Sequence, residues 1–181
     1  WSLDWEANRR FLARVVQGKD RFGEEILCDL FLNAMRRREE GKYDDAVARL
    51  YRLIEMVAQV ALMKHGVNTA DVDPDALPQS IRSMYAARRS PDTGKIVLGL
   101  QEDYRVLAEL GDPLGQAFLS NSRMRDLLSK RNVSILAHGT TSVRKEDGEA
   151  LEAEVRTLLG CRSQRFERLL SEGTFAKLES R

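Results

Sequence analysis

The chain has 181 residues, of which 43% are hydrophobic and 31% charged, and its formal net charge is +1. This composition excludes a disordered or low-complexity protein, and the balanced charge gives no overall sign of a polyanionic partner. No apolar run approaches the ~20 residues that span a bilayer, and the N-terminus lacks the pattern of a secretory signal. We therefore expect a soluble, cytoplasmic protein with no membrane partner.

Hydrophobic periodicity predicts helices throughout the chain and no convincing alternating strand, so the expected fold class is all-α. The first helix runs to Gln17 and ends at Gly18, and the next spans 23–40. Asp44 or Asp45 is expected to cap a long helix that continues to Lys64. The later predicted helices cover 80–89, 95–110, 114–119, 123–138 and 146–172, with Gly160 as a bend in the last one.

Three features carry a structural interpretation in preference to a functional one. His65 precedes Gly66 at the end of the long helix, where a histidine usually makes a favourable contact with the helix dipole. The acids within the 67–80 loop lack the spacing of a calcium site. Cys28 and Cys161 are isolated, so no zinc site or disulfide is expected, and both are predicted to be buried small side chains.

The helix predicted over 123–138 contains the most informative pattern. Its apolar stripe runs through Met124, Leu127, Leu128 and Ile135, but Arg131, Ser134 and His138 occupy positions where the stripe would continue. Arg131 and His138 are seven residues apart and so share one helix face. A satisfied structural pair is the commoner reason for such a spacing. However, no acid lies on this face, and an unneutralised arginine beside a histidine suits a phosphate better than a core.

The same region carries a local excess of positive charge. Between Arg123 and Lys145 there are six basic residues and a single acid, Asp126. A polyanion would bind here, and we expect Arg123, Arg125, Lys130 and Ser134 to contact it.

The run RNVSILAHG at 131–139 resembles the catalytic signature of the HEPN superfamily, in which an arginine and a following polar residue precede a histidine. Together with GKYDDAVARLYRLIEMVAQVAL at 41–62, it resembles the C-terminal domain of CRISPR-associated proteins that join a CARF sensor to a HEPN ribonuclease. The resemblance covers most of the chain from Gly23 onward. It implies a HEPN-like helical bundle at 21–181, with 1–20 as a linker helix from a missing N-terminal sensor domain.

The resemblance also implies catalytic roles for Arg131, Asn132 and His138 in cleaving single-stranded RNA. No phosphate-binding loop, dinucleotide motif, paired carboxylate or metal cluster is evident, so the expected enzyme is a metal-independent endoribonuclease that needs no cofactor. The ribose 2′-OH would attack the phosphate and leave 2′,3′-cyclic phosphate and 5′-OH ends. His138 would move protons near neutral pH, and Arg131 would bind the phosphate.

Partners follow from the same resemblance. HEPN ribonucleases pair, and a two-fold axis would bring both copies of Arg131 and His138 into one composite site of a homodimer. Cyclic oligoadenylate would act through the missing sensor domain, within type III CRISPR antiviral defence. Two alternatives stay open at this point. The chain could be a non-catalytic helical dimerisation or nucleotide-binding module, or a helical protein–protein adaptor.

Overall fold

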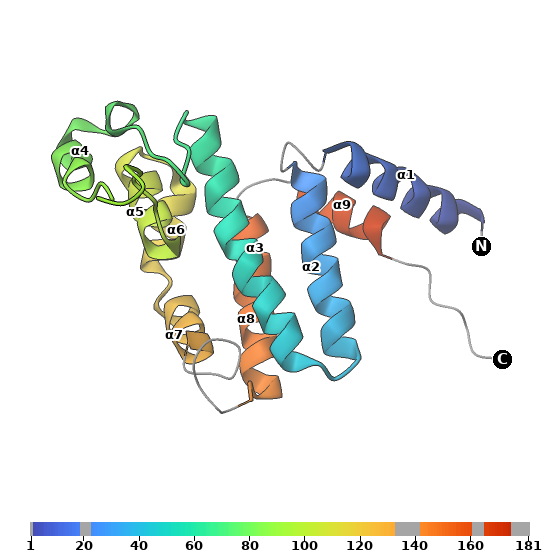
Figure 1. The fold of residues 1–181 in the computed structure, drawn as a ribbon. Coiled ribbons are helices and arrows are strands. Elements are labelled where there is room, and N and C mark those ends of the chain that lie inside the picture. Colours follow the sequence, from blue (N-terminus) through green and yellow to red (C-terminus); the bar gives the residue numbers. More distant parts are fainter. Residues whose placement is uncertain (1, 19–22, 133–141, 161–164, 175–181) are drawn as a thin grey trace. The chain divides into compact units, whose positions relative to one another are not determined.

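A computed structural model describes residues 2–18, 23–132, 142–160 and 165–174 (Figure 1). These residues form α-helices and one short 3-10 helix, with no strand among them, so the all-α prediction is confirmed. The helices are α1 (Ser2–Gly18), α2 (Glu24–Glu39), α3 (Tyr43–Lys64), α4 (Gln79–Ala86), α5 (Leu100–Glu109), α6 (Pro113–Ser120), α7 (Ser122–Asn132), α8 (Lys145–Gly160) and α9 (Arg165–Gly173), with the 3-10 turn η1 at Pro74–Ala76.

The chain divides into two compact units. The first contains residues 1–53 and 127–181, and the second contains 54–126. The unit boundaries fall within α3 and within α7, so each of these helices contributes its two halves to different units. The sequence predicts a different division, with a linker helix at 1–20 and one domain at 21–181. That division stays a prediction.

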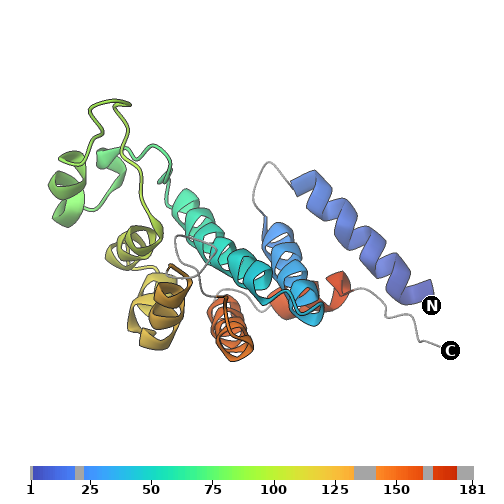
Figure 2. The ribbon, with the colours of Figure 1, turned by 60° about the horizontal axis from the view of Figure 1, so that its bottom comes forward.

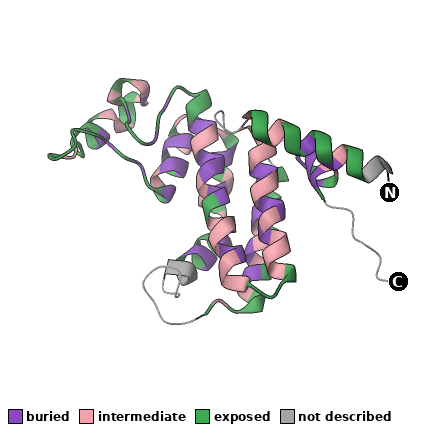
Figure 3. Cartoon of the chain, turned by 45° about the vertical axis from the view of Figure 1, so that its right-hand side comes forward, coloured by how far each residue is buried: buried purple, intermediate pink, exposed green. Residues whose placement is uncertain are grey.

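Aromatic side chains form the centre of the first unit. Phe31 of α2 and Phe166 of α9 meet edge to face, with ring centroids 5.9 Å apart, an arrangement that aromatic pairs favour. The guanidinium of Arg156 in α8 lies 5.2 Å from the Phe31 ring centroid, which joins a third helix to the pair. Figure 2 shows α2 beside the first half of α3, and buried residues follow both helices in Figure 3. The core is therefore shared between helices from the two ends of the sequence.

Helix α1 packs against α2 and α9. Phe11 is almost fully buried, and the amide nitrogen of Asn8 donates to the backbone carbonyls of Glu172 (2.6 Å) and Thr174 (2.9 Å) just where α9 ends. Arg14 also forms an ion pair with Glu172. Since unpaired carbonyls at a helix C-terminus need hydrogen-bond donors, Asn8 completes the end of α9. Helix α1 is thus an integral part of the first unit.

The second unit is built on the stacking of Tyr104 and Phe118, whose ring centroids are 3.8 Å apart. The Tyr104 hydroxyl donates to the carbonyl oxygen of Ile54 at 2.9 Å, which ties α5 to the second half of α3. Gly115 lets α6 approach α5 closely, because an added Cβ would lie 2.7 Å from the Cα of Ala108. The buried Tyr104 hydroxyl and Gly115 therefore both contribute to the packing of this unit.

Three details of the predicted elements are wrong. The 95–110 segment is helical only from Leu100, because the residues before it pair with the preceding loop. The Val72 amide donates to the Ile96 carbonyl (2.8 Å) and the Leu98 amide to the Thr69 carbonyl (3.0 Å). Helix α3 begins at Tyr43, so Asp44 and Asp45 lie in its first turn instead of capping it. The last predicted helix is two helices, since α8 ends at Gly160 and α9 begins at Arg165.

One further prediction, on the cysteines, is confirmed in part. Cys28 is fully buried, whereas Cys161 lies outside the described residues. Among the helices that the structure describes, none combines the length and the apolar character that crossing a membrane requires.

Replacing Gly115 with alanine should lower the free energy of unfolding by about 1–3 kcal/mol, because the new methyl group would press on the α5 backbone. Gly148→Ala is the matched control, since an added Cβ there would make an ordinary 3.6 Å contact with Val47. Removing a helical glycine should stabilise that variant by up to about 1 kcal/mol. Urea unfolding followed by circular dichroism measures both changes. Equal stability of the two variants would contradict the close α5–α6 approach.

Burial raises the pKa of the Cys28 thiol, and the nearby Glu24 and Glu25 carboxylates add to the effect. Because the thiolate is the reactive form, we expect Cys28 in a Cys161→Ser variant to react with Ellman's reagent on the order of 100-fold more slowly in the native protein than in denaturant. Rapid stoichiometric labelling of the native variant would show that the thiol is accessible.

Candidate active site

Helix α7 positions the first part of the predicted motif. Asn121 caps it, with its Oδ1 accepting a 2.9 Å hydrogen bond from the Met124 amide, which satisfies one of the free donors of the first turn. Met124, Leu127 and Leu128 have exposed fractions of 0%, 8% and 2%, so the apolar stripe predicted for this helix is confirmed over these three residues. The stripe turns α7 so that the side chains between these positions face solvent.

Arg131 and Asn132 occupy the last described turn of α7. By helical spacing, Arg131 continues the stripe, because it lies seven residues after Met124 and four after Leu127. Its side chain, and those of Lys130 and Asn132, lie outside the described residues, as do Ser134 and His138. The expected meeting of Arg131 and His138 on one face therefore stays a prediction.

The predicted basic cluster is narrower than the residue count indicates. Arg123 and Arg125 are exposed in the first turn of α7, as an RNA-binding role requires. The Arg144 Nε lies 3.2 Å from Asp147 and the Lys145 Nζ lies 3.8 Å from Glu149. These two cations have acidic neighbours on α8. The positive charge of Arg144 and Lys145 is therefore partly balanced within α8.

The chain that follows the motif is anchored at Val143. Its backbone amide donates to Oδ1 of Asp44, in the first turn of α3, at 2.8 Å. Sequence reasoning assigned Asp44 only a possible capping role and missed this contact. Its position in the GKYDDAV run was the available signal, but a tertiary hydrogen bond between residues 99 positions apart has no local pattern.

His65 has a structural partner, in line with its interpretation from sequence. Its Nε2 lies 3.0 Å from Oδ2 of Asp112, whose other oxygen accepts from the Leu114 amide and caps α6. Gly66 ends α3 with a φ of 77°, a conformation that favours glycine. His65 therefore helps to fix the turn before α6.

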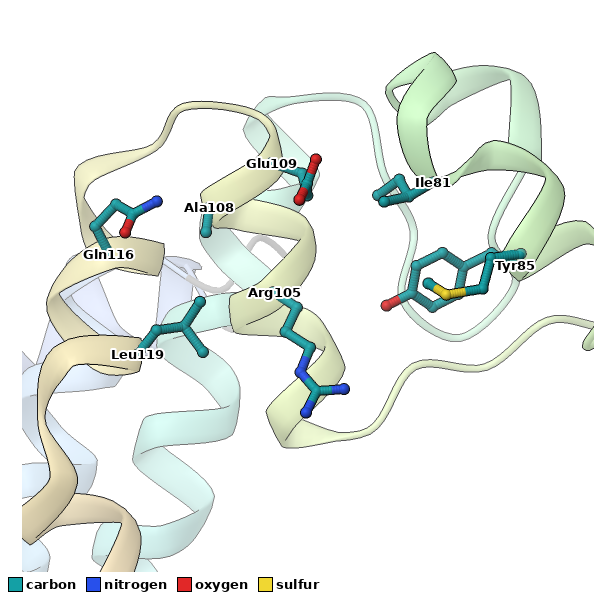
Figure 4. Close-up of a pocket in the computed structure, with 8 residues that line it drawn as sticks. Ile81, Tyr85, Arg105, Ala108, Glu109, Gln116 and Leu119 are labelled. Carbon is teal, nitrogen blue, oxygen red and sulfur yellow. The ribbon is translucent and has the colours of Figure 1, made fainter.

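A pocket of about 380 Å³ lies in the second unit (Figure 4). Ile81, Met84 and Tyr85 of α4 line one side, and the remaining lining residues are Arg105, Ala108, Glu109, Gln116 and Leu119. Burial raises the pKa of Tyr85, which keeps its hydroxyl neutral. Arg105 and Glu109 carry opposite charges one helical turn apart and are exposed. No histidine lines this pocket, and its one carboxylate, Glu109, accepts a 3.0 Å hydrogen bond from the Ser80 hydroxyl.

Within the described ranges, no three His, Cys, Asp or Glu side chains come together as metal ligands would. The assignment of the site to α7 and the residues that follow it stays a prediction from the sequence.

Comparison with known families identifies this region. A model of the Csm6 HEPN domain matches residues 17–161, which includes every residue of the predicted site. The chain belongs to this family and is a HEPN domain of a CRISPR-associated protein. Searches of curated proteins and of solved structures gave no match.

Proposed function

We propose that this HEPN domain is a metal-independent endoribonuclease that cleaves single-stranded RNA. The observation that supports the proposal is the position of the Arg131–Asn132–His138 motif inside the region that matches the HEPN family. Helix α7 supports it further, because a buried apolar stripe leads directly to Arg131 and exposed arginines flank the stripe. Family membership supports a nuclease, and the residues of the motif supply the chemistry.

In this proposal the nucleophile comes from the substrate. The ribose 2′-OH loses its proton and attacks the adjacent phosphorus, the bond to the 5′-oxygen breaks, and the leaving oxygen gains a proton. His138 transfers these protons, and Arg131 binds the phosphate and stabilises the additional negative charge of the transition state. Asn132 orients the phosphate or the histidine, and Ser134 donates a hydrogen bond. The products carry 2′,3′-cyclic phosphate and 5′-OH ends.

The complete site would form between two copies of the chain. One histidine is too few for separate acid and base roles, and a cation at a stripe position is stable only if another polar surface covers it. A two-fold axis through this face would supply a second Arg131 and a second His138. The homodimer would thus create one cleft with four basic groups for the RNA backbone.

The wider setting follows from the family. A type III CRISPR ancillary nuclease would act in the cytoplasm during antiviral defence. A sensor domain joined through the first helix would bind cyclic oligoadenylate and switch the HEPN domain on. Residues 1–20 would then connect sensing to cleavage.

The decisive substitution is His138→Ala. We expect at least a 100-fold loss of cleavage of labelled single-stranded RNA in EDTA, since general acid–base catalysis contributes about 10²–10⁴-fold. His65→Ala is the matched control and should keep its activity. Circular dichroism should show unchanged helix content for the His138 variant. Equal cleavage by wild type and His138→Ala would indicate contamination, and loss of folding would favour the non-catalytic helical module.

The product ends test the reaction itself. Mass spectrometry of the fragments formed in EDTA should show 2′,3′-cyclic phosphates that gain the mass of one water after mild acid treatment. Fragments with 5′-phosphates, or activity that requires added Mg²⁺, would instead indicate metal-assisted hydrolysis.

The exposed arginines of α7 should contribute electrostatic binding. Replacing Arg123 and Arg125 with glutamine should weaken binding of the RNA to the His138→Ala protein. It should also reduce the slope of log affinity against log salt by about 1.4, or ~0.7 for each lost phosphate contact. Arg9→Gln with Arg10→Gln, on α1, makes the same charge change away from the motif and should leave the slope unchanged. Equal slopes for both double variants would exclude α7 as the RNA-binding helix.

A further inference from the structure

The hydrogen bond between Asp44 and Val143 joins two distant parts of the first unit. Val143 is partly buried and stands five residues after His138 and two before α8 begins. Its amide donates to the Asp44 carboxylate at 2.8 Å. A hydrogen bond from a backbone amide to an ionised carboxylate is stronger than a neutral one. The chain that leaves the motif is therefore fixed at a defined point on α3.

The neighbouring contacts make this anchor part of a packed surface. Val47 lies one turn after Asp44 on the same face of α3 and is buried. Gly148, in the first turn of α8, lies beside it, and an added Cβ would make an ordinary 3.6 Å contact with Val47 Cγ2. The start of α3 thus holds the start of α8 by apolar packing and holds Val143 by a hydrogen bond.

Asp45 provides a natural comparison within the same turn. Its carboxylate pairs with Arg49 on α3 and lies 3.2 Å from Arg37 of α2. Both aspartates interact favourably with the positive end of the α3 dipole, but the described contact to Val143 comes from Asp44. Both residues therefore lie in the first turn of α3 and carry the same charge. Asp45 pairs with two arginines, whereas Asp44 accepts a hydrogen bond from the Val143 amide.

We propose that Asp44 is a positioning residue for the RNase site. Its carboxylate oxygen would fix the end of the segment that carries His138, while the buried stripe of α7 fixes the other end, which carries Arg131. This inference rests on the proposed function. The role requires a hydrogen-bond acceptor at Oδ1 and requires neither a negative charge nor a proton transfer. Asparagine, which keeps that acceptor, should therefore replace aspartate.

Catalysis is sensitive to such positioning, because a displacement of about 1 Å can cost on the order of 100-fold in rate. We expect Asp44→Ala to lower kcat by about 10- to 100-fold with KM changed less than about 3-fold. Asp44→Asn should restore kcat to within about 3-fold of wild type. Asp45→Ala, the matched control for the dipole and charge, should keep its kcat.

Amide hydrogen exchange of Val143, measured by NMR, tests the anchor without reference to activity. Its exchange should accelerate by about 10-fold or more in Asp44→Ala and stay slow in the other two variants. The positioning role is overturned if Asp44→Asn is as inactive as Asp44→Ala, if Asp45→Ala loses as much activity, or if Asp44→Ala retains full activity.

The two proposals can fail separately. If the wild-type chain cleaves no RNA but Val143 exchange responds as described, the nuclease proposal fails and the catalytic role of Asp44 fails with it, while the anchor stands. If the wild type cleaves RNA but Val143 exchanges equally fast in all proteins, the nuclease proposal stands and the positioning role is overturned.

Discussion

The proposed site depends on the burial of one side of α7. Met124, Leu127 and Leu128 set the rotation of the helix about its axis. Because α-helical positions repeat at about 100°, that rotation places Arg131 on the line of the stripe and turns Arg123 and Arg125 to solvent. Burying a guanidinium without a partner is too costly for a stable fold. In the proposed function, RNA phosphate and a second copy of the chain would provide the polar surface that Arg131 needs.

The structure supports the motif from both sides by different means. Upstream, the Asn121 cap and the apolar stripe hold α7. Downstream, Asp44 holds Val143, and Gly148 packs close to Val47. A ribonuclease that takes its nucleophile from the substrate needs few groups, but those groups must be held accurately. In the proposed mechanism, the contacts of α7 and of Val143 would meet this requirement.

Much of the fold follows from sequence because local signals determine it. Apolar periodicity and terminal glycines place most helices, and α1 ends at Gly18 as predicted. The errors arise where tertiary contacts override local preference. Ile96 and Leu98 form backbone hydrogen bonds with the 69–72 loop, so the 95–99 segment is not helical. The continuous apolar pattern after Glu146 concealed the end of α8 at Gly160.

In the candidate site, too, local sequence patterns predict some features, and tertiary contacts determine the others. Residue types and spacing on α7 predict the buried stripe at Met124, Leu127 and Leu128, which is confirmed, whereas the placement of the Arg131 side chain stays a prediction. The charge excess predicted for residues 123–145 omits Asp147 and Glu149, which lie just beyond that segment. These two acids lie near Arg144 and Lys145 and partly balance their positive charge. The anchoring role of Asp44 could not be predicted, since no local pattern specifies a partner 99 residues away.

The central claim is that Arg131 and His138 act together on one phosphate. A crystal structure of the chain with single-stranded RNA methylated at its 2′ oxygens, which blocks attack, tests it most directly. The account predicts that the Arg131 guanidinium and the His138 imidazole lie about 2.7–3.2 Å from the oxygens of one RNA linkage, with two chains forming the cleft. RNA bound elsewhere, or Arg131 paired within its own chain to a carboxylate far from His138, would contradict it.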